Sequence, residues 1–321
     1  MEKYEYVSFS SAGTRGIVFA GVLDAFETKM RNPTYDEWRS RLKGVSGTSS
    51  GAIAALIVAL GLSAEERNEM ITLMSDIRNV IRCPDVTLLL DRCGFENGES
   101  FRELIRTVLE TGGMSPSSTL KDLKRLLRLD VCFVCTDLST SSPMILSAEA
   151  TPDLRVDDAL YASCAVPFLF TPPIVRGVAV ADGVLTCNTP QVFPCDRTLF
   201  VTLGQGAPSS PAGWATYVQS IIRCNIWLQQ KMEETIPRKA RICVESPAID
   251  SFPAMDFDLR QEQVRVMRDV GYACAFDHLM GGELSRHASI AFSSVLRITL
   301  EAVEQRRTRE CEGDCEGGPS S

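Results

Sequence analysis

Histidine is scarce in this chain, with two among 321 residues. Because imidazole is the commonest side chain in protein metal sites, the scarcity argues against a histidine-rich metal centre. The nucleotide-binding patterns G-x-x-x-x-G-K-[ST] and G-x-G-x-x-G are also missing, which argues against a phosphate loop. We therefore expect neither a metal nor an organic cofactor.

Positive charge is in short supply as well. The sequence has 33 Lys and Arg against 41 Asp and Glu, a formal net charge of −8. No basic field is available to hold a phosphate backbone, so we expect no nucleic acid partner. The same balance argues against purely electrostatic docking on an anionic membrane.

Long apolar runs are absent too. No stretch approaches the roughly 18 apolar residues that a membrane-spanning helix requires, and the apolar run 52–62 is predicted to be a core helix. The first nine residues, MEKYEYVSF, lack the apolar segment of a signal peptide. The 12 cysteines are spread through predicted strands and helices, which is typical of buried free thiols in a reducing compartment. These features predict an intracellular, cytoplasmic protein.

Hydrophobic residues make up 45% and charged residues 23% of the chain, as is usual for globular proteins. Short apolar runs alternate with segments of helical periodicity. Strands are expected at 6–9, 131–136, 178–181, 199–203 and 241–244, and helices at 17–30, 156–164, 214–232, 261–279 and 288–303. This alternation predicts an α/β fold with three layers, a mostly parallel central sheet flanked by helices.

The sequence shows no internal repeat and no clear linker, so we expect a single domain over residues 5–303. Residues 306–321 are charged and then rich in Gly, Pro and Ser, and are expected to be a disordered tail. Residues 88–97 have no regular periodicity and are expected to be irregular. The apolar stripe of 214–232 favours packing on the sheet, with insertion into a lipid interface as the alternative.

The strongest motif is Gly47-Thr48-Ser49-Ser50-Gly51, a match to G-x-S-x-G. An apolar strand precedes it and an Ala-rich helix follows, the setting that holds a nucleophilic serine out of a sharp turn. Gly47 and Gly51 let the flanking backbone pass close by, and the helix N-terminus suits an oxyanion. The motif therefore predicts that Ser49 is a nucleophile. The alternative is a plain loop that enters a buried helix.

A second loop, residues 10–16, consists of small residues and Arg15 between the first strand and the first helix. Successive backbone N–H groups at a helix start form an anion nest. A plain strand-to-helix turn is the other interpretation of this loop.

A serine nucleophile needs a base. A Ser-Asp-His order would use Asp182 with His278 or His287, but both histidines lie in or near predicted helices rather than after a strand. Asp182 itself follows the strand 178–181, and the carboxyl ends of parallel strands share one face of a sheet. We therefore expect Asp182 to take the serine proton directly. An ordinary Asp-Gly turn is the alternative.

The three motifs, in this order, resemble those of the patatin-like phospholipases, a family of lipid acyl hydrolases with a Ser-Asp dyad. The resemblance rests on Ser11 to Gly16, Gly47 to Gly51 and Asp182-Gly183-Val184, supported by Thr136-Asp137-Leu138 and the run from Tyr161 to Pro167. It implies a patatin-like fold and the hydrolysis of fatty acyl esters of lipids or phospholipids through an acyl-enzyme, without a metal. It also implies a lipid or acyl ester substrate and peripheral contact with membranes.

The resemblance also assigns roles to single residues. Ser49 would be the nucleophile and Asp182 the base. The backbone of Gly13, Thr14, Arg15 and Gly16, with the N–H of Ser50, would form the oxyanion hole, and Gly47, Gly51 and Gly183 would be motif glycines.

Two positions depart from the family pattern. Ser11 and Ala12 stand where the loop normally has glycines, and Val184 stands where Gly or Ala is usual. A left-handed backbone at Ser11 or Ala12 would be strained, and Val184 would crowd Asp182. A second hypothesis is therefore a weak or inactive patatin-like protein that binds lipid or a partner. A Ser-His-Asp esterase is the third.

Overall fold

The computed structural model describes residues 1–75, 85–204, 214–232, 236–250, 252 and 259–281. Within these residues, one sheet has the strand order β10-β9-β1-β2-β4-β8-β7, with β5 paired to β4. The strands are β1 (Tyr6–Phe9), β2 (Gly44–Thr48), β4 (Asp130–Asp137), β5 (Ser142–Ser147), β7 (Ile174–Val175), β8 (Val178–Asp182), β9 (Thr198–Leu203) and β10 (Arg241–Val244).

Five strands, β10, β9, β1, β2 and β4, run parallel to one another. Strand β5 and strand β8 run antiparallel to β4, and β7 runs antiparallel to β8. The expected α/β fold with a mostly parallel sheet is therefore confirmed. The expectation that Asp182 follows a parallel strand was wrong, because β8 enters the sheet in the opposite direction.

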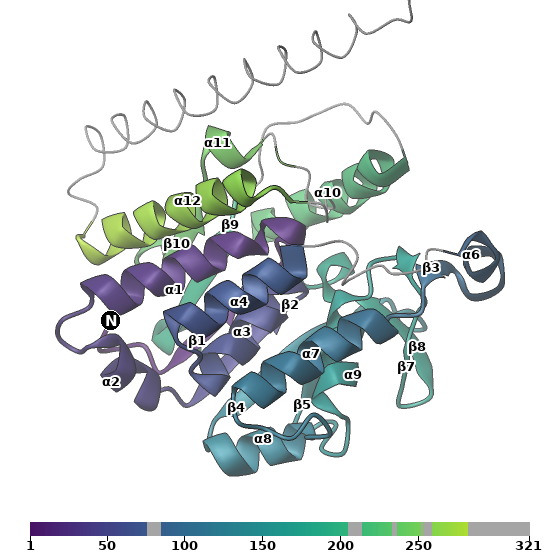
Figure 1. Ribbon diagram of the computed structural model, residues 1–321, viewed down its shortest axis with the longest axis horizontal. Helices are drawn as coiled ribbons and strands as arrows, with labels where there is room; N and C mark the ends of the chain where they lie inside the picture. The colour runs from purple at the N-terminus through teal and green to yellow at the C-terminus, as the bar shows by residue number, and fades with distance from the viewer. Residues whose placement is uncertain (76–84, 205–213, 233–235, 251, 253–258, 282–321) are drawn as a thin grey trace, which may run out of the picture.

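Helices flank the sheet (Figure 1). They are α1 (Ile17–Lys29), α2 (Tyr35–Ser40), α3 (Ser50–Leu60), α4 (Ala64–Ser75), α6 (Val86–Arg92), α7 (Glu99–Thr111), α8 (Leu120–Leu127), α9 (Val156–Cys164), α10 (Trp214–Met232), α11 (Pro247–Asp250) and α12 (Gln261–Leu279). Helix α3 packs on β1, β2 and β4, while α12 packs on α1 and β10.

Helices α1 and α12 approach closely at a pair of glycines. A Cβ atom on Gly21 would lie 1.9 Å from the carbonyl oxygen of Arg268, and one on Gly271 would lie 1.9 Å from that of Val18. Only glycine fits at either point, so this contact couples the C-terminal part of the described chain to the first helix.

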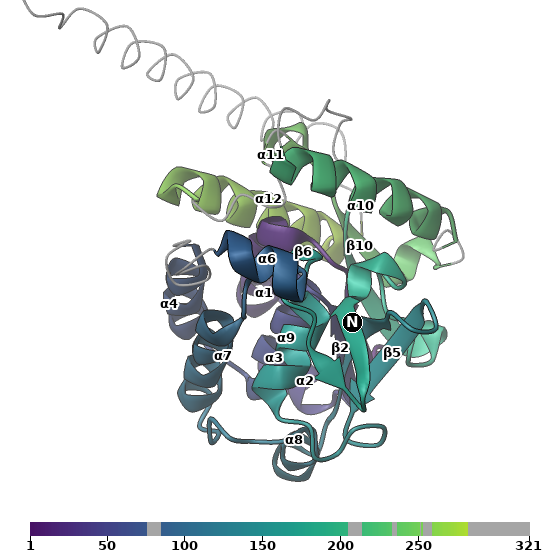
Figure 2. The same ribbon diagram turned by 90° about the vertical axis from the view of Figure 1, so that its right-hand side faces the viewer.

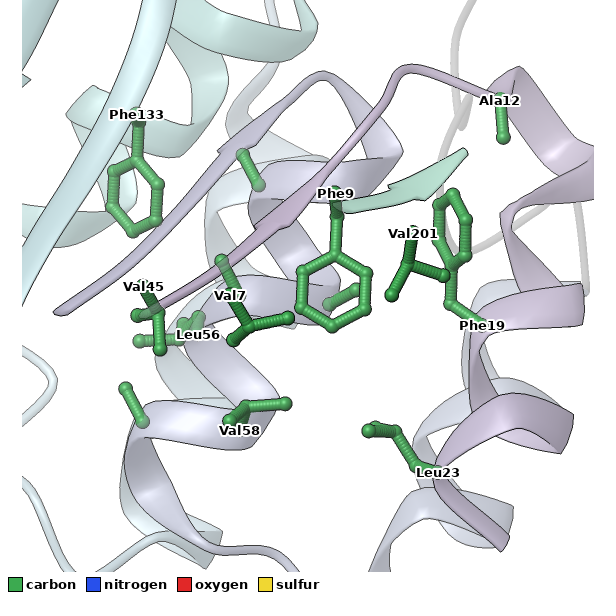
Figure 3. Packing of buried hydrophobic residues seen from close by; sticks show 14 of the residues in the cluster. Val7, Phe9, Ala12, Phe19, Leu23, Val45, Leu56, Val58, Phe133 and Val201 are labelled. Carbon is green, nitrogen blue, oxygen red and sulfur yellow. The ribbon is translucent and has the colours of Figure 1, made fainter. Parts of the chain in front are cut away.

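The core between the sheet and α1 and α3 is built from aliphatic and aromatic side chains (Figure 3). Phe9 of β1 and Phe19 of α1 form an edge-to-face pair with centroids 5.4 Å apart. Val7, Val201 and Leu56 are fully buried beside them. The burial of these residues fixes α1 and α3 against the strands from whose ends the site is built.

The expectation of irregular structure at 88–97 was wrong. Helix α6 begins after Asp85, whose side chain accepts a hydrogen bond from the N–H of Thr87. Strand β3 (Gly94–Glu96) then pairs with β6 (Phe168–Phe170) in a small parallel sheet. This partner comes from far along the chain, so local periodicity does not reveal the strand.

The helix expected at 214–232 is confirmed, but its apolar stripe does not simply pack on the sheet. Val218 is buried, whereas Tyr217, Ile221, Trp227 and Leu228 are 50–58% exposed. Figure 2 shows α10 at the outside of the fold. Helix α10 therefore presents an apolar surface, which we call the α10 stripe (Tyr217, Ile221, Trp227 and Leu228).

Among the described residues, no helix is both long and apolar enough to cross a membrane. The helix expected at 288–303 and the tail 306–321 lie outside the described residues. The single domain over residues 5–303 stays a prediction.

Candidate active site

The site forms where two strands meet end to end along one edge of β4. Thr48, the last residue of β2, lies opposite Val134, and Asp182, the last residue of β8, lies opposite Cys135. Because β5 occupies the other edge of β4 along the same residues, β2 and β8 share this edge. Their opposite directions bring their C-terminal ends together.

Ser49 occupies a sharp turn between β2 and α3. Its φ angle is +56°, a conformation that L-residues rarely adopt. A Cβ atom on Gly47 would lie 2.1 Å from the carbonyl oxygen of Gly51, and one on Gly51 would lie 2.3 Å from that of Ser10. The strand, the turn and the helix predicted around G-x-S-x-G are thus present, and both glycines are required by close backbone contacts.

A buried serine supports this turn. The backbone N–H of Ser49 donates to Ser163 Oγ at 3.0 Å, and the Ser163 hydroxyl donates to the carbonyl of Val134 at 2.7 Å. Ser163 therefore links the turn to β4. It also gives the Ser49 N–H a hydrogen-bond partner, which the backbone of α3 does not provide.

The Ser49 hydroxyl and the Asp182 carboxylate are in direct contact. Ser49 Oγ donates to Asp182 Oδ2 at 2.7 Å, and the N–H of Val184 donates to Oδ1 at 2.8 Å. The Thr136 hydroxyl donates to the backbone carbonyl of Asp182 at 2.9 Å. Asp182 is 1% exposed, so its side chain is held in one orientation away from water.

Burial sets the proton affinity of this carboxylate. Removal from water raises the pKa of Asp182 from 3.8 to about 7, although the hydrogen bonds from Val184 and Ser49 act in the opposite direction. A carboxylate with a pKa near the ambient pH is about half ionised, and its ionised form readily accepts a proton. The pair can therefore move the Ser49 proton to Asp182.

The loop at 10–16 is only partly available to an anion. The N–H groups of Ser10, Ser11 and Ala12 donate to Val201 O, Asn188 O and Ser50 Oγ. The nest expected over the whole loop is therefore wrong for its first three residues. The following turn of 3₁₀ helix, Gly13–Gly16, leads into α1 and lines the cavity beside Ser49.

The expected strain in this loop is absent. Ala12 has φ −150°, Ser11 is not among the residues with positive φ, and the left-handed position is Gly13 at +58°. Glycine therefore stands where the backbone needs it. The Ser11 hydroxyl instead donates to Asn188 Oδ1 at 2.6 Å, a contact that a glycine could not make.

Val184 lines the cavity and is 5% exposed. The 2.7 Å hydrogen bond between Ser49 and Asp182 forms beside it, so the expected crowding does not separate the pair. A Cβ atom on Gly183 would lie 2.2 Å from the carbonyl oxygen of Val134, which explains the glycine in this motif.

A cavity of about 230 Å³ opens at Ser49 and Asp182. Apolar side chains from four helices line it: Phe19 and Leu23 of α1, Ile53 and Ile57 of α3, Ile71 and Met74 of α4, and Phe101 and Leu104 of α7. The lining residues of α1 and α3 lie on successive turns of these helices. The cavity therefore extends from Ser49 along the space between them. Such an apolar space suits a hydrocarbon chain.

His278 is not part of this arrangement. His278 lies in the last turn of α12, where burial and the nearby N-terminal amino group lower its pKa, and it does not line the cavity. His287 lies outside the described residues. Within the described residues, no group of three or more His, Cys, Asp or Glu is placed to hold a metal ion.

Sequence reasoning missed two residues of the site. Ser163 lies in the run from Tyr161 to Pro167, which resembles a family segment, but the sequence assigned no role to this serine. Asn188 carried no signal, yet it accepts from both the N–H and the hydroxyl of Ser11.

The sequence model of the patatin-like phospholipase family matches residues 7–192, more than half of the chain. An uncharacterized protein of Acanthamoeba polyphaga mimivirus is 23% identical over 201 residues, covering 61% of this chain and 64% of that protein. A protein named cGAMP-activated phospholipase, from Escherichia coli, is 26% identical over 196 residues, covering 57% of this chain and 52% of that protein. The matches thus span less than two thirds of these relatives.

Among solved structures, VipD from Legionella pneumophila superposes with a TM-score of 0.54 at 16% identity. The superposition covers 87% of this chain and 67% of VipD. At this identity the likeness concerns the fold, and it extends well beyond the residues that the family model matches.

Proposed function

Because the chain belongs to the patatin-like phospholipase family, we propose that it hydrolyses acyl esters of lipids, including phospholipids, with Ser49 and Asp182 as a catalytic dyad. The observation that carries the proposal is the 2.7 Å hydrogen bond from Ser49 Oγ to the buried Asp182 carboxylate. The apolar cavity that opens at Ser49 supports a fatty acyl substrate.

In this mechanism Ser49 Oγ attacks the ester carbonyl carbon while its proton passes to Asp182. The tetrahedral intermediate collapses to an acyl-enzyme, and Asp182 returns the proton to the departing alcohol oxygen. Water then gives its proton to Asp182, attacks the acyl carbon and releases the fatty acid, and Ser49 recovers its proton. The net reaction consumes one water per ester bond.

The oxyanion of each intermediate needs hydrogen-bond donors. We assign this role to backbone N–H groups of Gly13, Thr14, Arg15 and Gly16, which line the cavity beside Ser49. The N–H of Ser50 joins them, because the first N–H groups of a helix have no partner inside it and Ser50 begins α3.

A weak or inactive protein that binds lipid is the second candidate, suggested by Ser11, Ala12 and Val184. The relaxed backbone at Ala12 and the intact contact between Ser49 and Asp182 favour the active enzyme. A Ser-His-Asp esterase is disfavoured by the position of His278 outside the cavity lining.

A turnover assay with fluorescent acyl esters tests the three candidates. We expect activity in the wild type and in His278→Ala, and its loss in Ser49→Ala and Asp182→Asn. A fluorophosphonate probe located by mass spectrometry should label Ser49. Loss of activity in His278→Ala would refute the dyad, and no turnover of any acyl ester by the wild type would favour the binding protein.

We also propose that α10 touches the lipid surface from which the substrate comes. Its four stripe residues are apolar and half exposed, and Trp and Tyr favour the interface between water and lipid. Ile222 and Ile226 of the same helix line the cavity. Contact through the α10 stripe would therefore place the lipid close to Ser49. The cytoplasmic location of the protein stays a prediction.

A further inference from the structure

The chain leaves the sheet after Asp182 in a stretch that we call the dyad segment (residues 183–188). It begins with a turn of 3₁₀ helix, Gly183–Leu185. Near its start, the N–H of Val184 donates to Asp182 Oδ1 at 2.8 Å. At its end, Asn188 Oδ1 accepts from the Ser11 hydroxyl at 2.6 Å. The position of the dyad segment therefore affects both the carboxylate and the loop at 10–16.

Two side-chain amides of α10 bind the backbone of the dyad segment. Gln229 Nε2 donates to the carbonyl of Val184 at 2.8 Å, and Gln229 Oε1 accepts from the N–H of Asn188. Asn225 Nδ2 donates to the carbonyl of Leu185. Because a carbonyl only accepts and an N–H only donates, these partners fix the orientation of the Gln229 amide. A single side chain thus joins the start of the segment to its end.

The spacing of the two amides allows them to act together. Asn225 and Gln229 are four residues apart, so they lie on the same face of α10. Gln229 Nε2 also donates to Asn225 Oδ1 at 3.1 Å, and both residues are half-buried. Leaving a polar group without a partner is costly where water has little access. The amide pair therefore holds the dyad segment against α10.

Val184 connects α10 to the carboxylate. Its carbonyl accepts from Gln229 and its N–H donates to Asp182 Oδ1, while Asp182 Oδ2 accepts from Ser49. Hydrogen bonds weaken steeply when their distance or angle departs from the preferred geometry. A displacement of the Val184 backbone would therefore loosen the carboxylate and change its alignment with the Ser49 hydroxyl.

We propose that Gln229, supported by Asn225, is a positioning residue for the catalytic pair. It fixes Val184 so that the Val184 N–H holds one carboxylate oxygen of Asp182 while the other faces Ser49. This inference rests on the proposed ester hydrolysis. It makes α10 a part of the catalytic machinery, because the helix that carries the α10 stripe also sets the geometry of the base.

The hydrogen bond from Val184 has a measurable consequence. It lowers the pKa of Asp182 against the larger effect of burial, which raises that pKa to about 7. A donor to the ionised form of an acid stabilises that form, so loss of the donor raises the pKa. If Gln229 holds Val184 in place, its replacement should move the ionisation of Asp182 to higher pH.

The other ionisable groups near Asp182 leave this readout clear. Among the described residues, the thiols of Cys135 on β4 and Cys164 on α9 interact with the carboxylate. Burial raises the pKa of both thiols, that of Cys135 to about 12, so both are neutral near pH 7. The positively charged side chains that line the cavity are Arg15, Arg67 and Arg223. None of these three is among the causes that set the pKa of Asp182.

Gln229→Met is the test variant, because methionine has a similar size but offers no comparable donor or acceptor. The assay is the hydrolysis of p-nitrophenyl butyrate, a soluble ester, from pH 5 to 9. We expect kcat to fall by roughly 3- to 10-fold with KM unchanged. The midpoint of the kcat/KM profile should rise by about one pH unit, the effect of losing a hydrogen bond to a charged group.

Gln230→Met is the matched control. Gln230 is the next residue of α10, is also half-buried and donates to a backbone carbonyl, that of Leu203 at the end of β9. It lines the cavity, so any effect of its replacement should fall on KM and leave the pH midpoint at the wild-type value. Asn225→Leu, which removes the donor to Leu185, should raise the midpoint by less than Gln229→Met does.

The remaining outcomes decide against the inference. A fall in kcat with an unchanged midpoint in Gln229→Met would indicate a structural role, and an equal rise in Gln230→Met would indicate a general effect on α10. If Gln229→Met does not fold, as judged by circular dichroism, the midpoint of Asn225→Leu decides. An active wild type with a flat pH profile would refute Asp182 as the base, and with it the role of Gln229. No turnover by the wild type would refute the proposed function itself.

Discussion

Asp182 is an ionisable group whose surroundings favour its neutral form. Its side chain is 1% exposed, and its nearest polar partners are the Ser49 hydroxyl and the Val184 N–H. No cationic side chain contributes to its pKa, which burial raises to about 7. In the proposed mechanism, this unfavourable ionisation gives Asp182 the basicity that a serine nucleophile needs.

We predict that kcat/KM for a soluble acyl ester follows the ionisation of Asp182. A general base must be deprotonated, so activity should fall by about tenfold per pH unit well below the midpoint and level off above it. The midpoint should lie near the pKa of about 7. A profile flat from pH 5 to 8, recorded where the fold is intact by circular dichroism, would contradict this assignment.

The same shift predicts how stability depends on pH. The folded protein holds the Asp182 proton more tightly than the unfolded chain does, so the contribution of Asp182 to stability falls as pH rises from about 4 toward about 7. Asp182→Asn removes the ionisation. We expect this variant to melt at a higher temperature than the wild type at pH 8, with a difference that shrinks toward pH 4.

Ser163 offers a test of positioning rather than chemistry. Ser163→Ala removes both the acceptor of the Ser49 N–H and the donor to the Val134 carbonyl. We expect kcat to fall by roughly 3- to 10-fold as the Ser49 turn loses its hydrogen bond, with KM and the pH midpoint unchanged. Ser8→Ala is a matched control, because Ser8 is also fully buried and donates to a backbone carbonyl, that of Pro190. Equal losses in both variants would mean a general effect on stability.

At the scale of elements, the meeting of β2 and β8 on one edge of β4 creates the site. Periodicity predicted both strands, but the direction of β8 follows from its pairing with β4 and β7. Strand β3 was missed for a related reason, because it is completed by β6 from more than 70 positions later in the chain. Local patterns report local preferences, and strand pairing is not local.

Helix α10 gives the prediction that belongs to this scale. Trp227→Ser with Tyr217→Ser should weaken sedimentation with phosphatidylcholine vesicles, because both half-exposed rings are lost. Turnover of a monomeric soluble ester should persist. Leu90→Ser and Ile174→Ser, two exposed apolar residues outside α10, are the controls. An equal loss of vesicle binding in the controls would show that α10 has no special role.

At the scale of the whole molecule, the net charge of the chain is negative, whereas most charged side chains that line the cavity are positive. The net charge of −8 repels anionic surfaces, while the cavity lining holds three arginines and one carboxylate among the described residues. The overall charge acts at long range and governs approach to a surface. The arginines of the lining act only at short range, on groups inside the cavity.

This separation predicts the effect of salt on vesicle binding. Raising ionic strength shortens the Debye length from about 30 Å at 0.01 M to about 8 Å at 0.15 M. Binding to vesicles rich in phosphatidylglycerol should therefore strengthen with salt, because repulsion is screened, while binding to phosphatidylcholine should change little. Weaker binding to the anionic vesicles at higher salt would reveal a basic docking patch instead.

The sequence by itself determined the α/β class and the turn at Ser49. The turn can be predicted from the sequence because it depends on a few neighbouring residues. Gly47 lies so close to the carbonyl of Gly51 that no side chain fits there. The ordered motifs also pointed to Asp182. The strand direction inferred for Asp182 was wrong, however, because β8 was expected to be parallel to its neighbours and is antiparallel.

Only the tertiary structure decided how these groups act together. It brought Asp182 against Ser49 across 133 positions of the chain by abutting two antiparallel strand ends. It buried that carboxylate and exposed the α10 stripe. It also placed Ser163 against the turn at Ser49 and Asn188 against the loop at Ser11. Burial, strand direction and the convergence of distant arginines arise from packing between segments far apart in the chain, which no local pattern encodes.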